Sequence, residues 1–204
     1  MTDELLADVS ASQGYIDSRL KFMVRQAVSD QILEGSGGGA SLTGILNKTG
    51  INTFNYSSFS GTLKRIGQVM EAITEIQKDA FMNPDAIIMH PSDWYQVVTE
   101  VNAVTTSGSL NPLFVGAGTF GEAVAPRLWG LPIVISTDIA SGTALVGVFG
   151  GGQAIHIVAR QGMEVSMSDS HSSNFIKDIV VMKASVRMGL PIYRATAFCS
   201  ITNF

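Results

Sequence analysis

The chain has 204 residues, a single cysteine and a formal net charge of −4. Its 13 lysines and arginines are scattered along the sequence, which argues against direct nucleic-acid recognition because neutralising phosphates takes clustered positive charge. Only 15% of the residues are charged, against roughly 25% in a typical globular domain. So few charges suggest a surface that meets other protein, although a compact, well-buried α+β domain would have the same composition.

Targeting and redox signals are the next features of the sequence. No apolar run approaches the ~18 residues that a transmembrane helix needs. The first residues, Met1–Leu5, are acidic and lack an apolar signal core, so we expect no secretory signal. A lone Cys199 excludes an internal disulfide, as expected for a protein that folds in a reducing cytoplasm.

Two helices are predicted in the first 80 residues. The first is long and amphipathic and runs from about Ser12 to Glu34. Its apolar residues at helical spacing are Ile16, Leu20, Val24, Ala27, Val28 and Ile32. The glycine-rich run 35–39 ends it, since glycine readily adopts the left-handed conformation of a helix end. A polar stretch at 52–60 precedes the second helix, which is predicted at about 62–80. Its apolar stripe is Leu63, Ile66, Val69, Met70, Ile73, Ile76 and Ala80.

The middle of the chain alternates short elements with loop. A turn at 83–85 leads into a short apolar strand, Ala86–Met89. The segment His90–Trp94 opens a third helix, because proline is favoured at the first helical position, and His90 is its expected cap. Residues 105–126 are rich in Gly, Thr, Ser and Pro and have little periodicity, which predicts a long loop or mobile tip.

The last third of the sequence is predicted to be mostly β. The expected strands are Ile133–Ile135, Leu145–Phe149, Ala154–Val158, Gly162–Met167 and Ile176–Val186. Trp94 and Trp129 are expected to anchor the core. Helices early in the chain and strands late in it predict an α+β fold.

A series of motifs occurs in a specific order along the chain. The late ones are Leu128-Trp129-Gly130-Leu131-Pro132, Ser141-Gly142-Thr143, Asn174-Phe175 and a long strand closing on Arg187 and Pro191-Ile192-Tyr193-Arg194. Upstream stand a glycine-rich turn followed by Gly44-Ile45-Leu46-Asn47, and then His90-Pro91-Ser92-Asp93-Trp94. From about residue 12 to Phe198, this order resembles the C-terminal part of the major capsid proteins of tailed phages, which share the Hong-Kong-97-type fold.

The resemblance implies an α+β fold with a long spine helix, a peripheral β-sheet and an α+β axial domain. Residues 1–51 and 155–191 would form the peripheral domain, and residues 52–154 and 192–204 the axial domain. The implied function is structural and not enzymatic: a head subunit that self-assembles into pentamers and hexamers of an icosahedral shell. That shell would be built in the host cytoplasm, become part of the virion and enclose DNA without sequence-specific binding. Scaffolding and portal proteins are further implied partners; no cofactor, metal or membrane is implied.

The resemblance also carries expectations about missing and altered parts. Family members have an N-terminal arm and a long hairpin before the spine helix, whereas this chain begins just before that helix. We therefore expect a shortened form, trimmed or encoded as such, that folds without building a closed shell. Some members crosslink their shells through a lysine–asparagine isopeptide bond helped by a glutamate. These positions would fall on Asp178 and Ser185, which are poorly suited to that chemistry, so we expect no self-crosslinking.

Candidate interface residues fall in two groups. Leu113, Phe114 and Gly116 lie in the flexible stretch that the resemblance places near a symmetry axis. Asp138 and Arg187 are candidates either for an interface or for pairing in the core.

Chemical alternatives have weak support in the sequence. Lys48-Thr49 lacks the glycine that a phosphate loop needs before its lysine, and the glycine run 35–39 follows a helix, so it does not open one. The three histidines lack metal-ligand spacing, and nothing pairs Cys199 with a base. Two other functions stay open. One is an encapsulin-type compartment, which has the same fold; the other is an enzyme or small-molecule binding domain with 105–126 as a lid, which would need convergent titratable groups.

Overall fold

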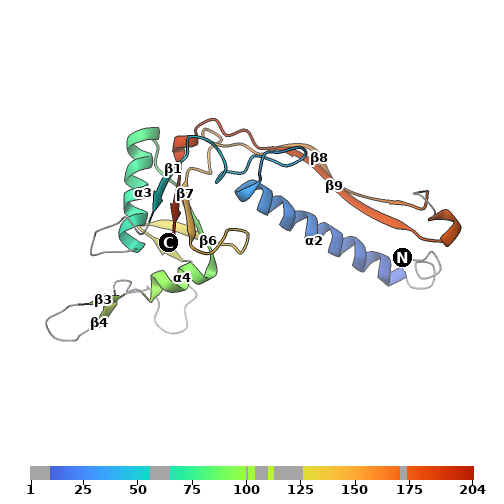
Figure 1. Ribbon diagram of the computed structural model, residues 1–204, viewed down its shortest axis with the longest axis horizontal. Coiled ribbons are helices and arrows are strands. Elements are labelled where there is room, and N and C mark those ends of the chain that lie inside the picture. The colour runs from blue at the N-terminus through green and yellow to red at the C-terminus, as the bar shows by residue number, and fades with distance from the viewer. Residues whose placement is uncertain (1–9, 56–64, 100, 104–109, 113–125, 171–173) are drawn as a thin grey trace.

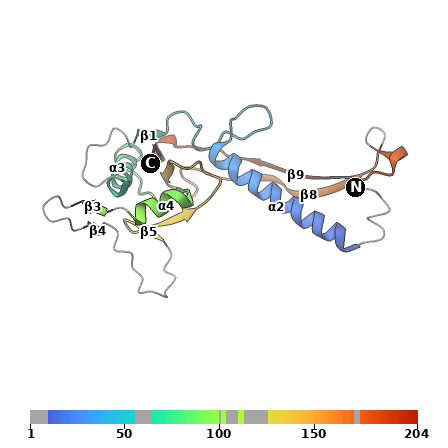
Figure 2. The ribbon, with the colours of Figure 1, turned by 60° about the horizontal axis from the view of Figure 1, so that its bottom comes forward.

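The structure is a computed structural model that describes residues 10–55, 65–99, 101–103, 110–112, 126–170 and 174–204. It has two parts, a globular lobe and an elongated arm that extends from it (Figure 1). The turned view in Figure 2 shows the same separation, with the helix and hairpin of the arm both running away from the globular lobe. Helices and a mixed sheet together make the α+β fold that the sequence predicts.

The arm consists of one helix and one hairpin. Helix α2 (Ser10–Glu34) lies along strands β8 (Val158–Ser168) and β9 (Val181–Gly189), which pair antiparallel with each other. The helix has 25 residues, so it is about 37 Å long. It ends where the sequence predicts.

The burial of helix α2 differs from the single buried apolar face that its spacing predicts. The stripe Ile16, Leu20, Val24, Val28 and Ile32 is only half-buried, and Ala27 is exposed. Large apolar side chains also stand clear of the hairpin: Tyr15 is 72% exposed and Phe22 54%. Residues seven apart share a helix face, so Tyr15 and Phe22 form a second, largely exposed apolar stripe. The Arg19 guanidinium lies over the Phe22 ring, 5.3 Å from its centroid.

The globular lobe is built on a six-stranded sheet with the order β1-β10-β7-β2-β6-β5. The strands are β1 (Asn52–Asn55), β10 (Phe198–Thr202), β7 (Thr143–Gly147), β2 (Ala86–Met89), β6 (Leu131–Ile135) and β5 (Arg127–Leu128). Strands β1 and β10 are parallel, as are β2 and β6, while the other neighbours are antiparallel. Strands β3 (Val101–Ala103) and β4 (Leu110–Pro112) form a separate antiparallel pair.

Two helices accompany this sheet. Helix α3 (Arg65–Ala80) packs against β10, β7 and β1 with Ile66, Val69, Ile73 and Ile76 buried, as its spacing predicts. Met70, which the predicted stripe also included, is 43% exposed, and Leu63 lies outside the described residues. Helix α4 (Pro91–Val98) is capped by His90, whose Nδ1 accepts a hydrogen bond from the Ser92 backbone N–H at 3.2 Å. The predicted cap and proline start are therefore confirmed.

Several expected elements differ in the structure. Residues 154–157 form no strand; Ile155 makes only an isolated bridge with Ile192. The last long strand begins at Val181 because residues 175–177 form a 3-10 turn. Trp129 is 49% exposed and not a core anchor; it stands in the β5–β6 turn with its indole Nε1 donating to the Ile66 carbonyl at 2.9 Å.

The arm joins the globular lobe at an elbow that backbone hydrogen bonds hold in place. After α2 the chain folds back, so that the Ile45 and Leu46 N–H groups donate to the carbonyls of Ile32 and Leu33 at 2.9 and 3.0 Å. A β-carbon at Gly44 would lie 2.4 Å from the Gly35 nitrogen, so the two backbones touch here without room for a side chain.

Asp93 is the main buried charge of the globular lobe. It is only 1% exposed, and its carboxylate accepts hydrogen bonds from the Gly142 N–H at 2.8 Å and the Ser141 hydroxyl at 3.2 Å. These bonds fix the turn before β7 onto α4.

We predict that Asp93→Ala lowers the free energy of unfolding by about 2 kcal/mol, because it leaves two donors without their acceptor. Glu71→Ala, at an exposed position of α3, is the control and should change the free energy by less than about 0.5 kcal/mol. Urea unfolding followed by circular dichroism measures both. Equal effects would show that the Asp93 contacts are not stabilising.

Candidate assembly surfaces

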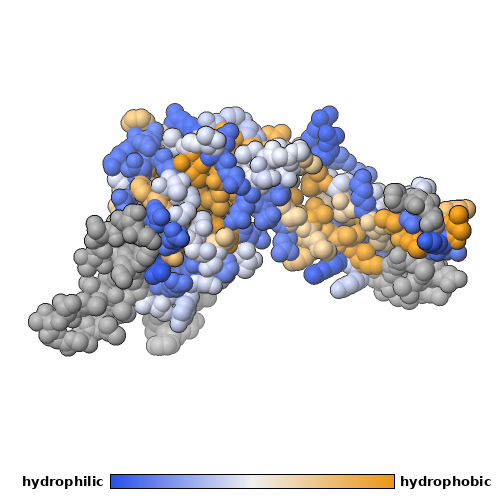
Figure 3. Space-filling view, viewed as in Figure 1, coloured by the Kyte–Doolittle hydropathy of each residue, from blue (hydrophilic) through white to orange (hydrophobic). Residues whose placement is uncertain are grey.

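Exposed apolar side chains occur on both parts of the molecule. On the arm these include Tyr15, Phe22, Met23, Ile157, Val158, Met167, Phe175, Ile176 and Val181. On the globular lobe they include Phe81, Tyr95, Trp129, Val134, Ile135 and Tyr193. Figure 3 shows hydrophobic atoms at the surface over the far end of the arm as well as over the globular lobe. Exposed apolar patches on a folded protein mark interaction surfaces.

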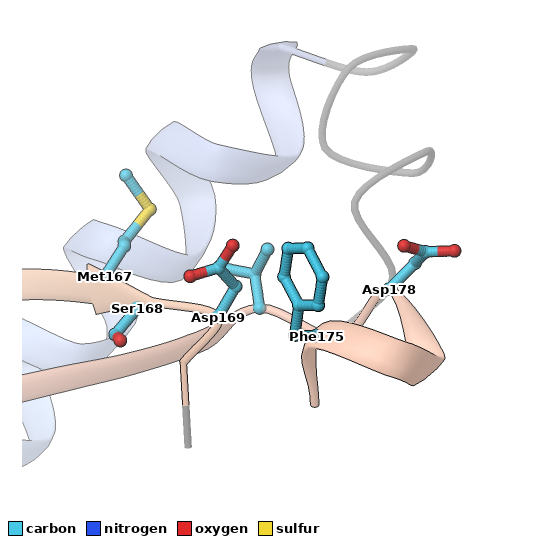
Figure 4. A pocket seen from close by; sticks show the side chains of 6 residues that line it. Met167, Ser168, Asp169, Phe175 and Asp178 are labelled. Atoms are coloured by element: carbon cyan, nitrogen blue, oxygen red, sulfur yellow. The ribbon is translucent and has the colours of Figure 1, made fainter. Parts of the chain in front are cut away.

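The far end of the hairpin carries the two most exposed of the apolar side chains on the arm. Phe175 is 74% exposed and Ile176 84%. Figure 4 shows the Phe175 ring standing between the carboxylates of Asp169 and Asp178. This tip is therefore an apolar projection flanked by charges.

The structure places the two crosslink positions, Asp178 and Ser185, in different kinds of local structure. Asp178 is exposed, but it is not a strand residue: it ends the 3-10 turn with φ +50°, in the left-handed region that Asp tolerates better than most residues. Ser185 does lie on β9, opposite Glu164 of β8. The Glu164 carboxylate accepts a hydrogen bond from the Gln161 amide at 2.8 Å. Nothing in the sequence indicates that a carboxylate stands opposite Ser185.

Asp138 lies at the elbow, in a groove of about 480 Å³ that also contains Asp30 and Glu34 of α2. Its carboxylate accepts a hydrogen bond from the Ser136 hydroxyl at 3.2 Å. Glu34 accepts a hydrogen bond from the Ala140 N–H at 3.1 Å, which ties α2 to the same loop. Asp138 is thus partly buried within this groove.

Arg187 lies exposed on β9 of the arm. The ion pairs found in the described part of the chain are Lys21–Asp17 and Lys78–Glu75. Arg187 and Asp138 therefore form no ion pair, either with each other or with another described residue. The other three candidates, Leu113, Phe114 and Gly116, lie outside the described residues.

The described residues contain no group of three or more His, Cys, Asp and Glu side chains that could hold a metal ion. None of the helices in the described ranges is both long and apolar enough to cross a membrane. Cys199 lies fully buried in β10. Burial raises the pKa of its thiol from 9.0 to about 12, with smaller contributions from the carboxylates of Glu75 and Glu71.

We predict that Cys199 resists thiol reagents at pH 8 in the folded protein and reacts once the protein is unfolded in urea. Below pH 9 the thiol is neutral in both states. Above it, the unfolded state releases a proton that the folded state retains, so stability should fall as the pH rises from about 9 toward 12. Rapid labelling without denaturant would contradict the buried position.

Comparison with known proteins identifies the family of this chain. The chain belongs to the phage capsid family, whose model matches residues 1–203. It is 28% identical over 195 residues to the major capsid protein of Enterobacteria phage HK97. The aligned region covers 95% of this chain and 47% of that protein. The chain therefore spans about half the length of this curated relative.

Solved structures agree on the fold. The capsid of an empty GTA particle superposes with a TM-score of 0.75 at 18% identity, covering 98% of this chain and 69% of that one. An encapsulin complex from Synechococcus elongatus PCC 7942 gives a TM-score of 0.59 at 12% identity, covering 100% of this chain and 70% of that one. The resemblance to capsid proteins and the α+β fold that the sequence indicated are both confirmed.

Proposed function

We propose that this protein is a subunit of an icosahedral phage or prophage head, which assembles with copies of itself into pentamers and hexamers. The observation that carries the proposal is apolar exposure at both ends of an elongated, two-part molecule, from Ile176 at the arm tip to Trp129 and Tyr193 on the globular lobe. Membership of the phage capsid family supports it. A binding pocket would concentrate apolar surface in one place, whereas a shell subunit needs several separate contacts.

The two parts have different proposed places in the shell. Residues 1–51 and 155–191 would form the peripheral domain, and residues 52–154 and 192–204 the axial domain that meets its copies around a symmetry axis. In such rings each contact is heterologous, so different patches of neighbouring copies meet, and a closing rotation makes a ring. Leu113, Phe114 and Gly116 would lie near the axis, and Asp138 and Arg187 at contacts between copies.

The energy of assembly would come from many modest contacts. Burying apolar surface contributes about 25 cal/mol per Å², so each patch adds little, and a subunit is held firmly only when several patches are covered together.

The proposed role involves no catalysis or cofactor. The shell would enclose DNA as a container, assemble in the host cytoplasm with scaffolding and portal proteins, and end in the virion.

A second candidate is the shell of an encapsulin compartment, which the likeness to an encapsulin favours at the level of the fold. The subunit contacts would be of the same kind, but the enclosed material would be protein. An enzymatic or small-molecule binding function has less support, because, among the described residues, the groove that contains Asp30, Glu34 and Asp138 is lined by no histidine, cysteine or basic side chain that could act with these carboxylates.

Light scattering and electron microscopy of the purified protein test self-assembly. We expect pentamers or hexamers from this chain, and closed shells once the N-terminal arm and hairpin of the family are restored upstream of it. Nucleic acid packaged in particles made in the host would favour the phage head, and packaged protein would favour the compartment. A protein that stays strictly monomeric at high concentration would contradict the proposal.

We also predict that assembly leaves the subunits without covalent links. With Asp178 at the acceptor position and Ser185 at the helper position, the isopeptide reaction lacks its amide electrophile. Denaturing electrophoresis and mass spectrometry of assembled material should show a single 21.7 kDa species. A ladder of multimers that survives denaturation and reducing agent would contradict this prediction.

A further inference from the structure

Phe81 combines a strained backbone with an exposed aromatic side chain. It directly follows the last residue of α3 and has a φ of +55°, in the left-handed region where glycine is favoured at the end of a helix. A bulky side chain makes this conformation costly. The side chain is 86% exposed, so packing within the described part of the chain offsets little of that cost.

The contacts around Phe81 hold the turn in this conformation. The Arg194 guanidinium donates a hydrogen bond to the Ala80 carbonyl at 2.7 Å, and the Gln77 amide donates one to the Asn83 Oδ1 atom at 3.0 Å. These bonds lie on both sides of Phe81 and fix the backbone from which its side chain projects. Strained residues that a fold holds in place in this way cluster at functional sites.

A pocket at the elbow matches a phenyl group in size and polarity. We call it the elbow pocket; it has a volume of about 280 Å³. An apolar cavity of roughly 150 Å³ is already large enough for a benzene molecule. No carboxylate, lysine or arginine stands among the described residues that line the elbow pocket, whereas the groove that contains Asp138 is acidic.

The apolar wall of the elbow pocket is open to an incoming side chain. Ile32, Ile88, Phe149 and Leu190 are only partly buried, and Ile157 is 54% exposed. Phe149 makes an edge contact with Phe198, with the ring centroids 5.5 Å apart. Aromatic side chains favour a further aromatic partner in an offset or edge arrangement, so Phe149 suits a phenyl group better than an aliphatic one.

The polar groups beside the two surfaces are complementary as well. His156 lines the elbow pocket and is exposed. Asp79 is exposed two residues before Phe81. An imidazole can donate a hydrogen bond to a carboxylate in its neutral form as well as in its charged form. A copy that presents Phe81 to the pocket therefore brings an acceptor for His156 with it.

Phe81 and the elbow pocket lie on opposite sides of the globular lobe. Helix α3, which Phe81 follows, lies on the side of the sheet away from the arm in both views (Figures 1 and 2). The pocket is lined by Ile32 of α2 and by Ile157 and Leu190, next to the ends of β8 and β9. A copy therefore cannot fill its own pocket with Phe81, but a neighbour can. Such a contact is heterologous, and a closing rotation turns it into a ring of copies.

The area of the contact indicates the kind of assembly that it serves. A buried phenylalanine removes about 150–250 Å² from water. A stable interface between two proteins buries about 1,200 Å² or more in total. One side chain in one pocket therefore cannot hold an isolated pair together. The contact has to act with the other contacts of a closed ring, in which each copy gives one Phe81 and receives one.

We propose that Phe81 of each copy inserts into the elbow pocket of the neighbouring copy in a ring, with its phenyl group against Phe149, Ile157 and Leu190. The inference rests on the proposed function, since it requires that copies assemble. Because Ile32 of the arm and Ile88 of the globular lobe both line the pocket, the inserted side chain also braces the elbow of the copy that receives it.

The substitution Phe81→Gly separates folding from assembly. Glycine adopts the left-handed backbone without strain and the lost side chain is exposed, so the free energy of unfolding in urea should be unchanged or higher. Association, measured by sedimentation velocity over a concentration series, should weaken about tenfold or more, as expected for the loss of one buried phenylalanine. A purely structural role would give the reverse, a less stable protein that associates normally.

The substitution Ile157→Glu tests the pocket. It places a charge at an exposed position of the lining, so the protein should fold, associate as weakly as Phe81→Gly and lose little more when the two substitutions are combined. Val158→Glu is the matched control, an adjacent exposed apolar residue outside the lining, and any effect it has should add in full to that of Phe81→Gly. Full additivity for Ile157→Glu would overturn the pairing.

Photocrosslinking identifies the surface that Phe81 contacts. With benzoylphenylalanine in place of Phe81, light should link this position to residues of the elbow pocket, and a mixture of isotope-labelled and unlabelled chains should show that each link joins two copies. Links to another surface, within one copy only or not at all would overturn the inference. Association that Phe81→Gly leaves unchanged would remove this inference alone, whereas a chain that stays monomeric at high concentration would contradict the proposed function as well.

Discussion

The structure depends on one constraint: the arm cannot bury its own apolar surface. A single helix lies on a two-stranded sheet, and a two-stranded sheet is marginal by itself in water. Apolar side chains consequently face outward on α2, at Tyr15 and Phe22, and at the hairpin tip, at Phe175 and Ile176. In the proposed assembly, a neighbour that covered these side chains would stabilise the arm at the same time as it formed a contact, so folding and assembly would be thermodynamically linked.

The globular lobe provides the rigid base that this arrangement needs. Its sheet and α3 bury a continuous core, and Asp93 locks the turn before β7 onto α4. The elbow then fixes the arm relative to that base through paired backbone groups around Gly35 and Gly44 and through the Glu34–Ala140 hydrogen bond. A fixed elbow means that contacts at the arm tip and contacts on the globular lobe are made at a set angle, which a closed shell requires.

The sequence predicted local features well. Period and caps located α2, α3, β2 and the start of α4, because these signals lie within a few residues of each other. It missed β1 (Asn52–Asn55), a mostly polar segment that becomes a strand by pairing with β10 at the other end of the chain. The sequence also placed Asp178 on a strand, where a left-handed turn residue stands instead.

Surfaces that the fold assembles from distant segments are harder to predict from the sequence. An amphipathic pattern predicts that the face of a helix opposite its apolar stripe is polar and solvated. Helix α2 differs, because Tyr15 and Phe22 are exposed apolar side chains. We infer that other subunits cover them. A groove between α2 and β9 is lined by both Gln31 and Arg187, which are more than 150 residues apart in the chain. No local pattern signals such a pair; only the packing of β9 against α2 creates it.

The most direct test of this account is hydrogen–deuterium exchange of the protein before and after assembly, read residue by residue over α2, β8 and β9. If neighbours complete the arm, amide exchange should slow over β8–β9 and over α2 near Tyr15 and Phe22 upon assembly, while the core of the globular lobe changes little. Unchanged exchange in the arm of an assembled particle would contradict the central claim, because the arm would then be stable without being covered.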